Sequence, residues 1–474
     1  MLRVLYTTWP LLLGVLLLML GNGVQGSLLG IRGTMEAFTT FQLSFVMSAY
    51  FLGFLLGSRY VPGMIQHVGH IRVFAALGSL ISAVLVVYPM LIDWQAWALM
   101  RVVIGFGFAG VYITAESWLN DTATNETRGQ ALSAYMIVQM IGIISAQGLL
   151  AIGDPFGYDL FLIPSVLVSL AFLPLLLATY PSPKFETGQR LGFRELYRIS
   201  PLGCVGIFLI GGVFSAMFGM ASVWGSISLL SIGQIALFTS ALYIGGLILQ
   251  YPIGRLSDRI DRRKIIVWLS VVATVIMAVA TIFPLPFPAY LVVAALLGGI
   301  TYPIYGLIIA YTNDYLSKEQ MAAASAGLLF INGVGSIFGP LIVGWLMGRD
   351  VMGPRGFFFF VGVLYAMLAG YAAWRMTKRA TPVMTGAYAN IAPMASAVAS
   401  VAVVENAAEI NPSPENPEAA AEAAQALIIH RDQSTPAAAP EQPAPDPAQQ
   451  GDDRRASGAG EPDPGEENPP QREA

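Results

Sequence analysis

The sequence predicts an all-α membrane protein with twelve transmembrane helices in two pseudo-symmetric six-helix bundles, followed by a disordered C-terminal tail. Three observations lead to this fold class. Of 474 residues, 55% are hydrophobic and 11% are charged, against roughly 45–50% and 25% in a soluble domain. The mean hydropathy is +0.64. Twelve separate segments are apolar over the length of a bilayer crossing. This composition excludes a water-soluble globule.

The candidate spans follow from length and composition. A helix needs about 20 mostly apolar residues to cross the hydrocarbon core of a bilayer. The first candidate is too long and too interrupted by polar residues to be a cleaved signal peptide, and eleven more follow it. The twelve spans are expected near residues 9–30, 39–58, 71–92, 95–118, 130–152, 159–180, 201–222, 233–252, 264–283, 289–312, 321–347 and 357–376.

The charges divide the chain and orient the spans. Residues 401–474 carry 15 acidic and 4 basic residues, a net charge of −11, whereas residues 1–400 carry a net charge of +7. With the N-terminus inside, 17 Lys and Arg residues fall in cytoplasmic loops and helix ends, and 3 fall outside. The positive-inside rule therefore predicts a multi-pass protein of the inner (plasma) membrane with both termini in the cytoplasm.

The longest cytoplasmic connection divides the spans into two halves. We expect an N-terminal bundle over residues 1–180, a central loop over 181–200, and a C-terminal bundle over 201–378. A weak internal repeat supports this division, because residues 62–72 align with residues 254–264 at an offset of 192. Residues 379–474 are rich in Ala, Pro, Glu and Gln and predict a disordered acidic cytoplasmic tail.

The loop after the eighth span carries a recognisable motif. Residues 254–264 read Gly-Arg-Leu-Ser-Asp-Arg-Ile-Asp-Arg-Arg-Lys. This resembles the signature loop of the major facilitator superfamily, Gly-x-Leu-Ser/Ala-Asp-Arg-x-Gly-Arg-Arg, with Asp261 in place of the second glycine. An acid beside several bases can form a cytoplasmic latch between helices; alternatively, the bases only set the topology. The gate candidates in this loop are Gly254, Asp258, Arg259, Arg262 and Arg263.

The equivalent loop of the first half departs from the motif, because Gln66 occupies the position of the acid. Together with Ala-Glu-Ser-Trp-Leu at 115–119 and Thr-Arg-Gly at 127–129, it is similar to the YcaD-like bacterial branch of the superfamily. Two acids near cytoplasmic helix ends, Glu116 and Asp314, can pair with the bases; alternatively, each can carry a proton. The remaining gate candidates are Gly69, Arg72, Arg128, Glu116 and Asp314.

Arg101 lies inside the fourth span and is the leading functional candidate. Four residues later comes Gly105, a spacing that resembles a superfamily motif linked to proton transfer in proton-coupled members. An arginine at the centre of a membrane helix costs roughly 2.5–3.5 kcal/mol on insertion scales, so its side chain should face protein or water and have a partner. Two roles are open: substrate or proton coupling, or a structural pin to Asn22 or Gln25 of the first span.

The resemblance implies that helices 1, 4, 7 and 10 line a central cavity. On these and neighbouring spans the sequence places aromatic and neutral polar side chains around a single cation. Such a set suits a small neutral or anionic organic substrate, although each aromatic residue taken singly is more typical of packing. The substrate or coupling candidates are Arg101, Asn22, Gln25, Tyr112, Gln139, Trp224, Tyr302, Tyr305 and Asn332.

The sequence offers no apparatus for catalysis. The single cysteine excludes a multi-cysteine metal site, and three histidines leave few other metal ligands. No phosphate-binding loop or catalytic triad pattern occurs in the sequence. We therefore expect no enzyme activity, cofactor, metal or nucleic-acid partner. The sequence predicts a monomeric secondary active transporter that moves a small organic molecule across the lipid bilayer by alternating access, with protons as the coupling ion by analogy. The alternative is a membrane sensor or scaffold of the same fold that acts through its acidic tail.

Overall fold

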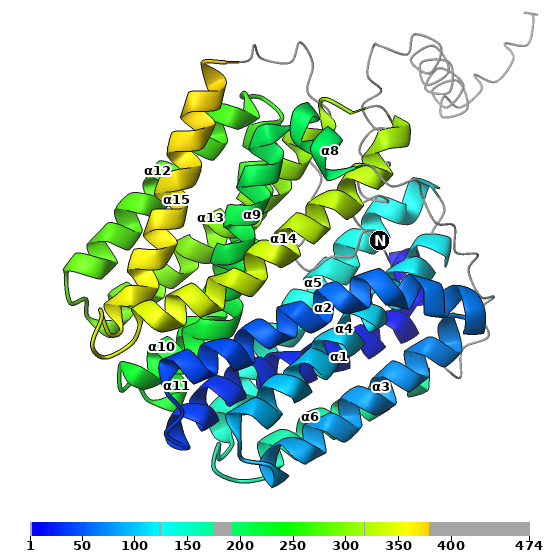
Figure 1. The fold of residues 1–474 in the computed structure, drawn as a ribbon. Helices are drawn as coiled ribbons and strands as arrows, with labels where there is room; N and C mark the ends of the chain where they lie inside the picture. Colours follow the sequence, from blue (N-terminus) through cyan, green and yellow to red (C-terminus); the bar gives the residue numbers. More distant parts are fainter. Residues whose placement is uncertain (1, 123–124, 175–191, 317, 379–474) are drawn as a thin grey trace, which may run out of the picture. The chain divides into compact units, whose positions relative to one another are not determined.

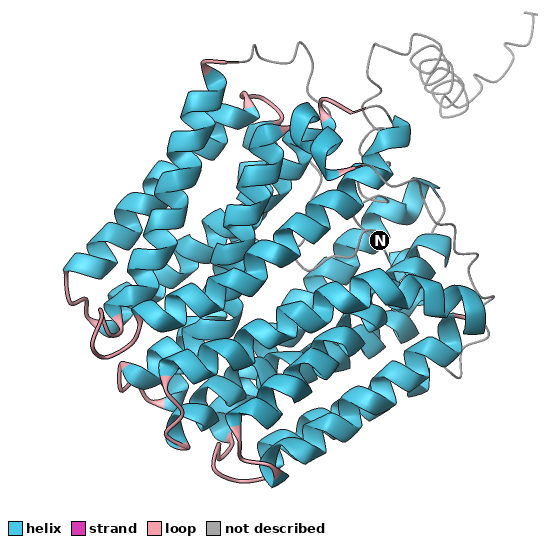
Figure 2. Cartoon of the chain, viewed as in Figure 1, coloured by secondary structure: helices cyan, strands magenta, loops and turns pink. Residues whose placement is uncertain are grey.

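The computed structural model describes residues 2–122, 125–174, 192–316 and 318–378, and every regular element in these ranges is a helix (Figure 2). The expected tail at 379–474 and most of the expected central loop lie outside the described residues. The helices are α1 Leu2–Met35, α2 Thr40–Val68, α3 His70–Val87, η1 Tyr88–Met90, α4 Trp94–Thr122, α5 Asn125–Ile152, α6 Asp159–Ala171, α8 Phe193–Ile199, α9 Pro201–Ser215, η2 Ala216–Met220, α10 Ala221–Ile227, α11 Ile232–Ser257, α12 Arg262–Ile282, α13 Phe287–Asn313, α14 Lys318–Leu346 and α15 Arg355–Met376.

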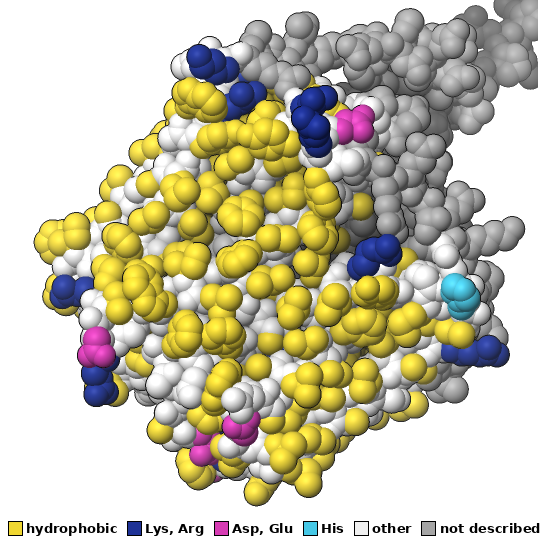
Figure 3. Space-filling view, viewed as in Figure 1, with side chains coloured by type: hydrophobic (Ala, Val, Ile, Leu, Met, Phe, Trp, Pro, Cys, Tyr) yellow, Lys and Arg dark blue, Asp and Glu magenta, His cyan; other side chains and the backbone are white. Residues whose placement is uncertain are grey.

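Within the described residues, 11 helical segments are long and apolar enough to cross a membrane. The expected sixth span, residues 159–180, begins as α6, a 13-residue apolar helix, and its remainder runs into the undescribed residues 175–191. Large apolar side chains such as Trp268 and Ile248 are 63% and 62% exposed. Figure 3 shows apolar side chains over the middle of one face, with most charged side chains toward its margins. This surface fits a lipid environment.

The seventh span contains a feature that the sequence did not predict. α9, η2 and α10 form one span, Pro201–Ile227, and its middle turn η2 is a π-helix. A π-helical turn widens the helix locally and is frequent at functional sites. Phe218 and Gly219 lie on this turn and contact α2. A further unpredicted element is α8, seven residues of helix inside the expected loop at 181–200.

The helices pack in a pattern that occurs twice along the chain (Figure 1). In residues 2–171, α1 packs against α5 and α6, α2 against α4, and α3 against α4 and α6. In residues 201–376, α9 packs against α14 and α15, α11 against α13, and α12 against α13 and α15. Contacts between the two ranges join α2 to α14, α5 to α11 and α1 to α10.

Glycines allow the closest of these helix pairs to form. A Cβ at Gly53 or Gly105 would overlap a backbone carbonyl across the α2–α4 contact, and a Cβ at Gly245 or Gly298 would do the same across the α11–α13 contact. The two pairs are offset by 192 and 193 positions, which agrees with the sequence repeat. Small residues thus bring the backbones together where apolar side chains would hold them apart.

Replacing Gly298 by alanine is expected to destabilise the protein by about 1–3 kcal/mol, because the added methyl group must push α13 away from the Leu242 carbonyl of α11. Thermal melting of the purified protein in detergent measures the loss. Gly370→Ala is the matched control, since no atom lies within 4 Å of a Cβ at this helical position of α15. Equal melting temperatures for the two variants would contradict the role assigned to Gly298.

Candidate functional site

Arg101 is fully buried between α1, α2 and α4. One terminal nitrogen donates to Gln25 Oε1 at 2.7 Å, and the other donates to the Met47 thioether at 3.4 Å. The guanidinium carbon lies 4.8 Å from the ring centre of Tyr50. Its Nε has no hydrogen-bond partner. The sequence analysis named Gln25 as a partner of Arg101. It did not name Met47 or Tyr50, which both lie on α2.

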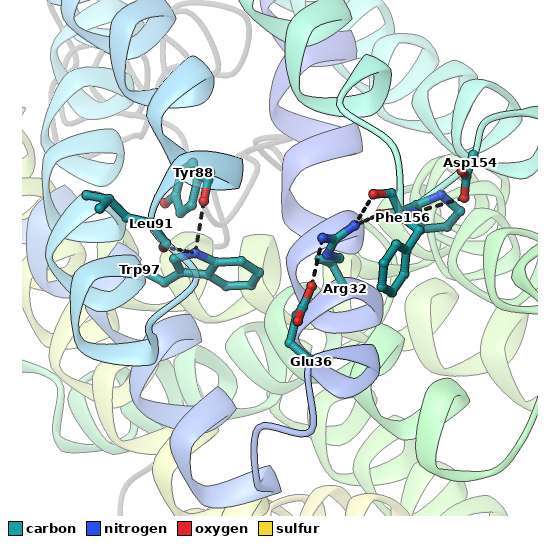
Figure 4. Close-up of polar contacts among 8 residues, drawn as sticks. Arg32, Glu36, Tyr88, Leu91, Trp97, Asp154 and Phe156 are labelled. Atoms are coloured by element: carbon teal, nitrogen blue, oxygen red, sulfur yellow. Dashed lines mark hydrogen bonds and ion pairs between the residues drawn. The ribbon is translucent and has the colours of Figure 1, made fainter.

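Trp97 and Tyr88 hold the surroundings of Arg101 in place. The Trp97 indole lies one helical turn before Arg101 and donates to the carbonyls of Tyr88 at 3.2 Å and Leu91 at 2.9 Å (Figure 4). This ties η1 to α4. The Tyr88 hydroxyl in turn accepts from Gln25 Nε2 at 3.4 Å, while Gln25 Oε1 binds Arg101. The amide of Gln25 is thereby oriented with its oxygen toward the guanidinium.

A second buried arginine, Arg32, lies near the end of α1 and has a very different environment. Its guanidinium pairs with Glu36 at 2.7 Å and donates to the backbone carbonyls of Pro155, at 3.1 Å, and Phe156 (Figure 4). The Phe156 ring covers it at 4.2 Å. These contacts fasten α1 to the loop between α5 and α6. Arg32 is a structural clamp with its charge neutralised by a carboxylate.

A chain of polar side chains continues from the Arg101 site along the interior. Asn22 Nδ2 donates to the hydroxyls of Tyr112 at 3.0 Å and Tyr50 at 3.4 Å. One turn beyond Tyr112 on α4 is Glu116, fully buried, which accepts a hydrogen bond from the Tyr135 hydroxyl of α5 at 3.0 Å. The predicted residues Asn22, Tyr112 and Glu116 therefore lie in the same interior as Arg101.

The second-half gate candidates separate into two groups. Arg262 of α12 forms a two-point ion pair with Asp314 at the end of α13, at 2.5 and 2.7 Å, with both side chains buried. Arg263 pairs with Asp261 at 2.9 Å. Asp258 and Arg259 are exposed at the end of α11. The structure thus pairs Asp314 with Arg262, within residues 201–376, and the pair pins α12 to α13.

The first-half gate candidates are not gathered in the same way. Gly69 ends α2 with φ 88°, a conformation that favours glycine, and caps the helix through its N–H. Arg72 is exposed on α3, and no ion pair in the described part of the chain joins it to Glu116. The side chain of Arg128 lies outside the described residues. Gly254, the corresponding glycine near the end of α11, is buried and its carbonyl accepts from Ser257 at 2.6 Å.

The remaining cavity candidates lie in several places. Trp224 packs among Phe238, Tyr290, Phe357 and Phe358, an aromatic cluster of α10, α11, α13 and α15. Tyr302 contacts the rings of Phe214 and Tyr243, Tyr305 is buried on α13, and Gln139 is half-buried on α5. Gln139 hydrogen-bonds to Tyr135, the partner of Glu116. The hydrogen-bond and ring contacts of Arg101 with other described residues include none of these four side chains.

Asn332 lines a small cavity between α2, α9 and α14. The other lining side chains include Phe54, Leu55, Phe214 and Leu329. Its volume is ≈ 20 Å³, which holds one water molecule and is far below the volume of an organic substrate. Phe54 on its wall contacts the Tyr112 ring at 6.0 Å. The cavity therefore adjoins the polar chain that leads to Arg101.

Sequence comparison decides the family of this chain. The profile of the Major Facilitator Superfamily matches residues 11–230 and 204–403. The chain belongs to the major facilitator superfamily. This superfamily assignment confirms the resemblance read from the loop at 254–264, and it identifies a multi-pass membrane transporter and not an enzyme.

Relatives within the superfamily also support the branch. The uncharacterized MFS-type transporter YcaD of Escherichia fergusonii is 26% identical over 339 residues, which cover 71% of this chain and 88% of the relative. YcaD of Salmonella arizonae is 25% identical over 345 residues, with the same two coverages. The similarity to the YcaD-like branch, predicted from three short segments, is confirmed.

Solved superfamily structures share the fold. The nucleoside transporter NupG matches with a TM-score of 0.62 at 17% identity, over 78% of this chain and 99% of its own. A bacterial homologue of the human lysosomal transporter Spinster, inward-facing and unoccupied, matches with 0.62 at 14%, over 85% and 98%. The Escherichia coli fucose:proton symporter FucP matches with 0.52 at 13%, over 78% and 99%. At these identities the likeness shows the fold alone.

Proposed function

We propose that the protein is a secondary active transporter that carries a small organic molecule across the inner membrane by alternating access of two six-helix halves, with protons as the coupling ion. The halves are residues 1–180 and 201–378. The observation that carries this proposal is the division of the helix contacts. Close pairing within each half is repeated at an offset of about 192 residues, while a separate set of contacts joins the halves.

Several contacts between the halves use small side chains near one end of the helices, the end at which α1 stops with Met35 and α2 begins with Thr40. We call this set of contacts the seam. Ser48 Oγ donates to the Ile337 carbonyl of α14 at 2.6 Å. A Cβ at Gly30 would overlap Ser222 of α10, and a Cβ at Gly344 would overlap Ser44 of α2. No ion pair between described residues crosses this seam, so the halves can separate there without breaking a buried charge pair.

The direction of opening follows from topology. The 3 Lys and Arg residues expected outside all lie near the Met35 end of the helices. Those of the 17 expected inside that fall within the described residues lie toward the other end. The seam therefore closes the outer side in this proposal, and the structure represents an inward-facing state. The cavity beside Asn332 lies between α2 and α14, about one helical turn from the Ser48 contact on the side away from the Met35 end.

Proton coupling has two supports within this proposal. Glu116 is a fully buried carboxylate linked to Tyr135, and Tyr112 precedes it by one helical turn. A carboxylate at such a site is suited to take up and release one proton per cycle. The fold is also that of FucP, a fucose:proton symporter.

Exchange between two states is testable without a known substrate. In a Cys204→Ala background, Ser222→Cys places a thiol behind the closed seam, where Ser222 is 4% exposed. Alternating access predicts that a membrane-impermeant maleimide added outside intact cells labels this position slowly but completely. A scaffold that does not change state would leave it unlabelled, which would contradict the proposal.

A cross-link supplies the control. The Cβ of a cysteine at position 333 would lie 3.7 Å from Leu55 Cβ, within the usual Cβ separation of a disulfide. Adding Leu55→Cys and Gly333→Cys should therefore allow an oxidised bond between α2 and α14 that holds the seam closed. Labelling of the Ser222→Cys position should stop after oxidation and return after reduction. Unchanged labelling with the bond formed would show that the thiol is reached by local fluctuation instead.

A further inference from the structure

Arg101 differs from every other buried arginine in the described part of the chain. Four arginines there are buried, and three of them have a carboxylate partner: Arg32 with Glu36, Arg262 with Asp314, and Arg263 with Asp261. Arg101, with no exposed surface, takes part in none of the ion pairs between described residues. A buried charge without a counter-charge is costly, so a protein that needed only a pin at this place would gain by supplying an acid.

The contacts of Arg101 leave a place for an anion. A guanidinium has five N–H groups arranged as a fork that fits a carboxylate. Here one donation goes to the Gln25 amide and one to the Met47 thioether, and Nε has no partner. A thioether is a weak acceptor. A carboxylate in the place of the Met47 sulfur would form charge-assisted hydrogen bonds of roughly twice the strength of neutral ones.

The two side chains that cover Arg101 also form the contact with the other half. Met47 Cβ lies 3.0 Å from the position that a Cβ would take at Gly219 of η2. The Tyr50 ring, which covers the guanidinium, lies 5.5 Å from the ring of Phe218 in the same turn. Displacing Met47 from Arg101 therefore disturbs the contact between α2 and η2, and separating α2 from η2 uncovers Arg101.

We propose that the substrate is a monoanionic organic acid, whose carboxylate replaces the Met47 thioether on Arg101 and thereby loosens the contact between α2 and η2. A single guanidinium among neutral neighbours matches one negative charge. The rings of Tyr50, Tyr88 and Phe218 provide an apolar wall for the rest of the molecule. This inference rests on the proposed transport function, because it names the substrate class of that carrier.

The experiment uses matched probes on the purified full-length protein. Benzoate, benzamide and benzylamine have the same ring and carry a negative, no and a positive charge at neutral pH; propionate and inorganic phosphate complete the set. A ligand that binds the folded state raises its melting temperature. We expect a concentration-dependent rise with benzoate or propionate and no rise with the amide, the amine or phosphate. No rise with either carboxylate, or an equal rise with another probe, would overturn the proposal.

Variants assign the effect to the site. Arg101→Met should abolish the carboxylate shift and, by removing an uncompensated buried charge, raise the melting temperature of the ligand-free protein. Arg101→Lys keeps the charge without the fork and should leave a reduced shift. Met47→Leu conserves volume but removes the sulfur that competes with the anion, and should lower the carboxylate concentration needed for half of the shift. A carboxylate shift retained in Arg101→Met would overturn the assignment.

The link to gating has its own measurement. In the Cys204→Ala, Ser222→Cys protein, benzoate or propionate should accelerate maleimide labelling at position 222, and Arg101→Met should remove this acceleration. Labelling that occurs but does not respond to carboxylates would leave alternating access intact and refute only the substrate class. Carboxylate binding without any labelling would refute the transport cycle and leave the anion site intact.

Discussion

Asp314→Asn is expected to lower the stability of the protein by about 3–5 kcal/mol, because it leaves the Arg262 guanidinium buried without its carboxylate. The two side chains are 1% and 3% exposed, and the pair is bonded at two points. Thermal melting in detergent measures the loss. Asp350→Asn, which changes an exposed acid in the turn after α14, is the control and should differ from the wild type by less than about 0.5 kcal/mol.

A double variant tests the cause of this destabilisation. Adding Arg262→Gln to Asp314→Asn removes the unpaired charge, so part of the lost stability should return. A double variant less stable than Asp314→Asn alone would indicate that Arg262 is held by other groups. A melting temperature for Asp314→Asn equal to that of Asp350→Asn would refute the view that this pair pins α12 to α13.

Gly344→Val is expected to shift the carrier toward the outward-open state. In the closed seam, the valine side chain would overlap Ser44 of α2. Overpacking of this kind costs about 1–3 kcal/mol, which moves a two-state equilibrium by a factor of about 5 to 150. Maleimide labelling of the Ser222→Cys position from outside should accelerate by a similar factor, because the seam that covers it no longer closes.

Gly370→Val provides the comparison, because it adds the same side chain to a helix position with no atom within 4 Å of its Cβ. It should leave the labelling rate unchanged. If Gly344→Val labels at the wild-type rate while the purified protein melts normally, α2 and α14 do not form the outer seam. A loss of stability equal to that of Gly298→Ala would instead show that Gly344 serves packing within one state.

Much of the fold was predictable because membrane segments obey a simple length and composition rule. Eleven expected spans correspond to long apolar helices in the described residues, and the loop at 254–264 identified the superfamily correctly. The bond between Gln25 and Arg101 also followed from sequence, since a buried cation on α4 needs a partner on the neighbouring helix. Periodicity did not predict the π-helical turn η2, because the span Pro201–Ile227 is apolar and buried on nearly every side, so a one-residue shift leaves no visible break in its apolar pattern.

The ion pairs were harder to predict from the sequence than the membrane spans. The motif placed Asp258 and Arg259 beside Arg262 and Arg263, and a linear sequence does not show which base turns inward. The helix exit at Asp258 leaves the first two exposed, while the start of α12 directs Arg262 toward Asp314. Trp224 lies in an aromatic cluster, which agrees with the expectation that a single aromatic residue is more typical of packing.

By itself, the sequence determined that this chain is an all-helical membrane transporter of the major facilitator superfamily, because hydropathy and a loop motif are local properties. Only the tertiary structure decided that Arg101 lacks a carboxylate partner and that Met47 and Tyr50 both cover it and contact η2. Residues from α1, α2, α4 and the π-helical turn meet there across more than a hundred positions of chain. The reason is physical: burial and counter-charge depend on which helices pack together, and side-chain spacing along one helix does not specify its neighbours.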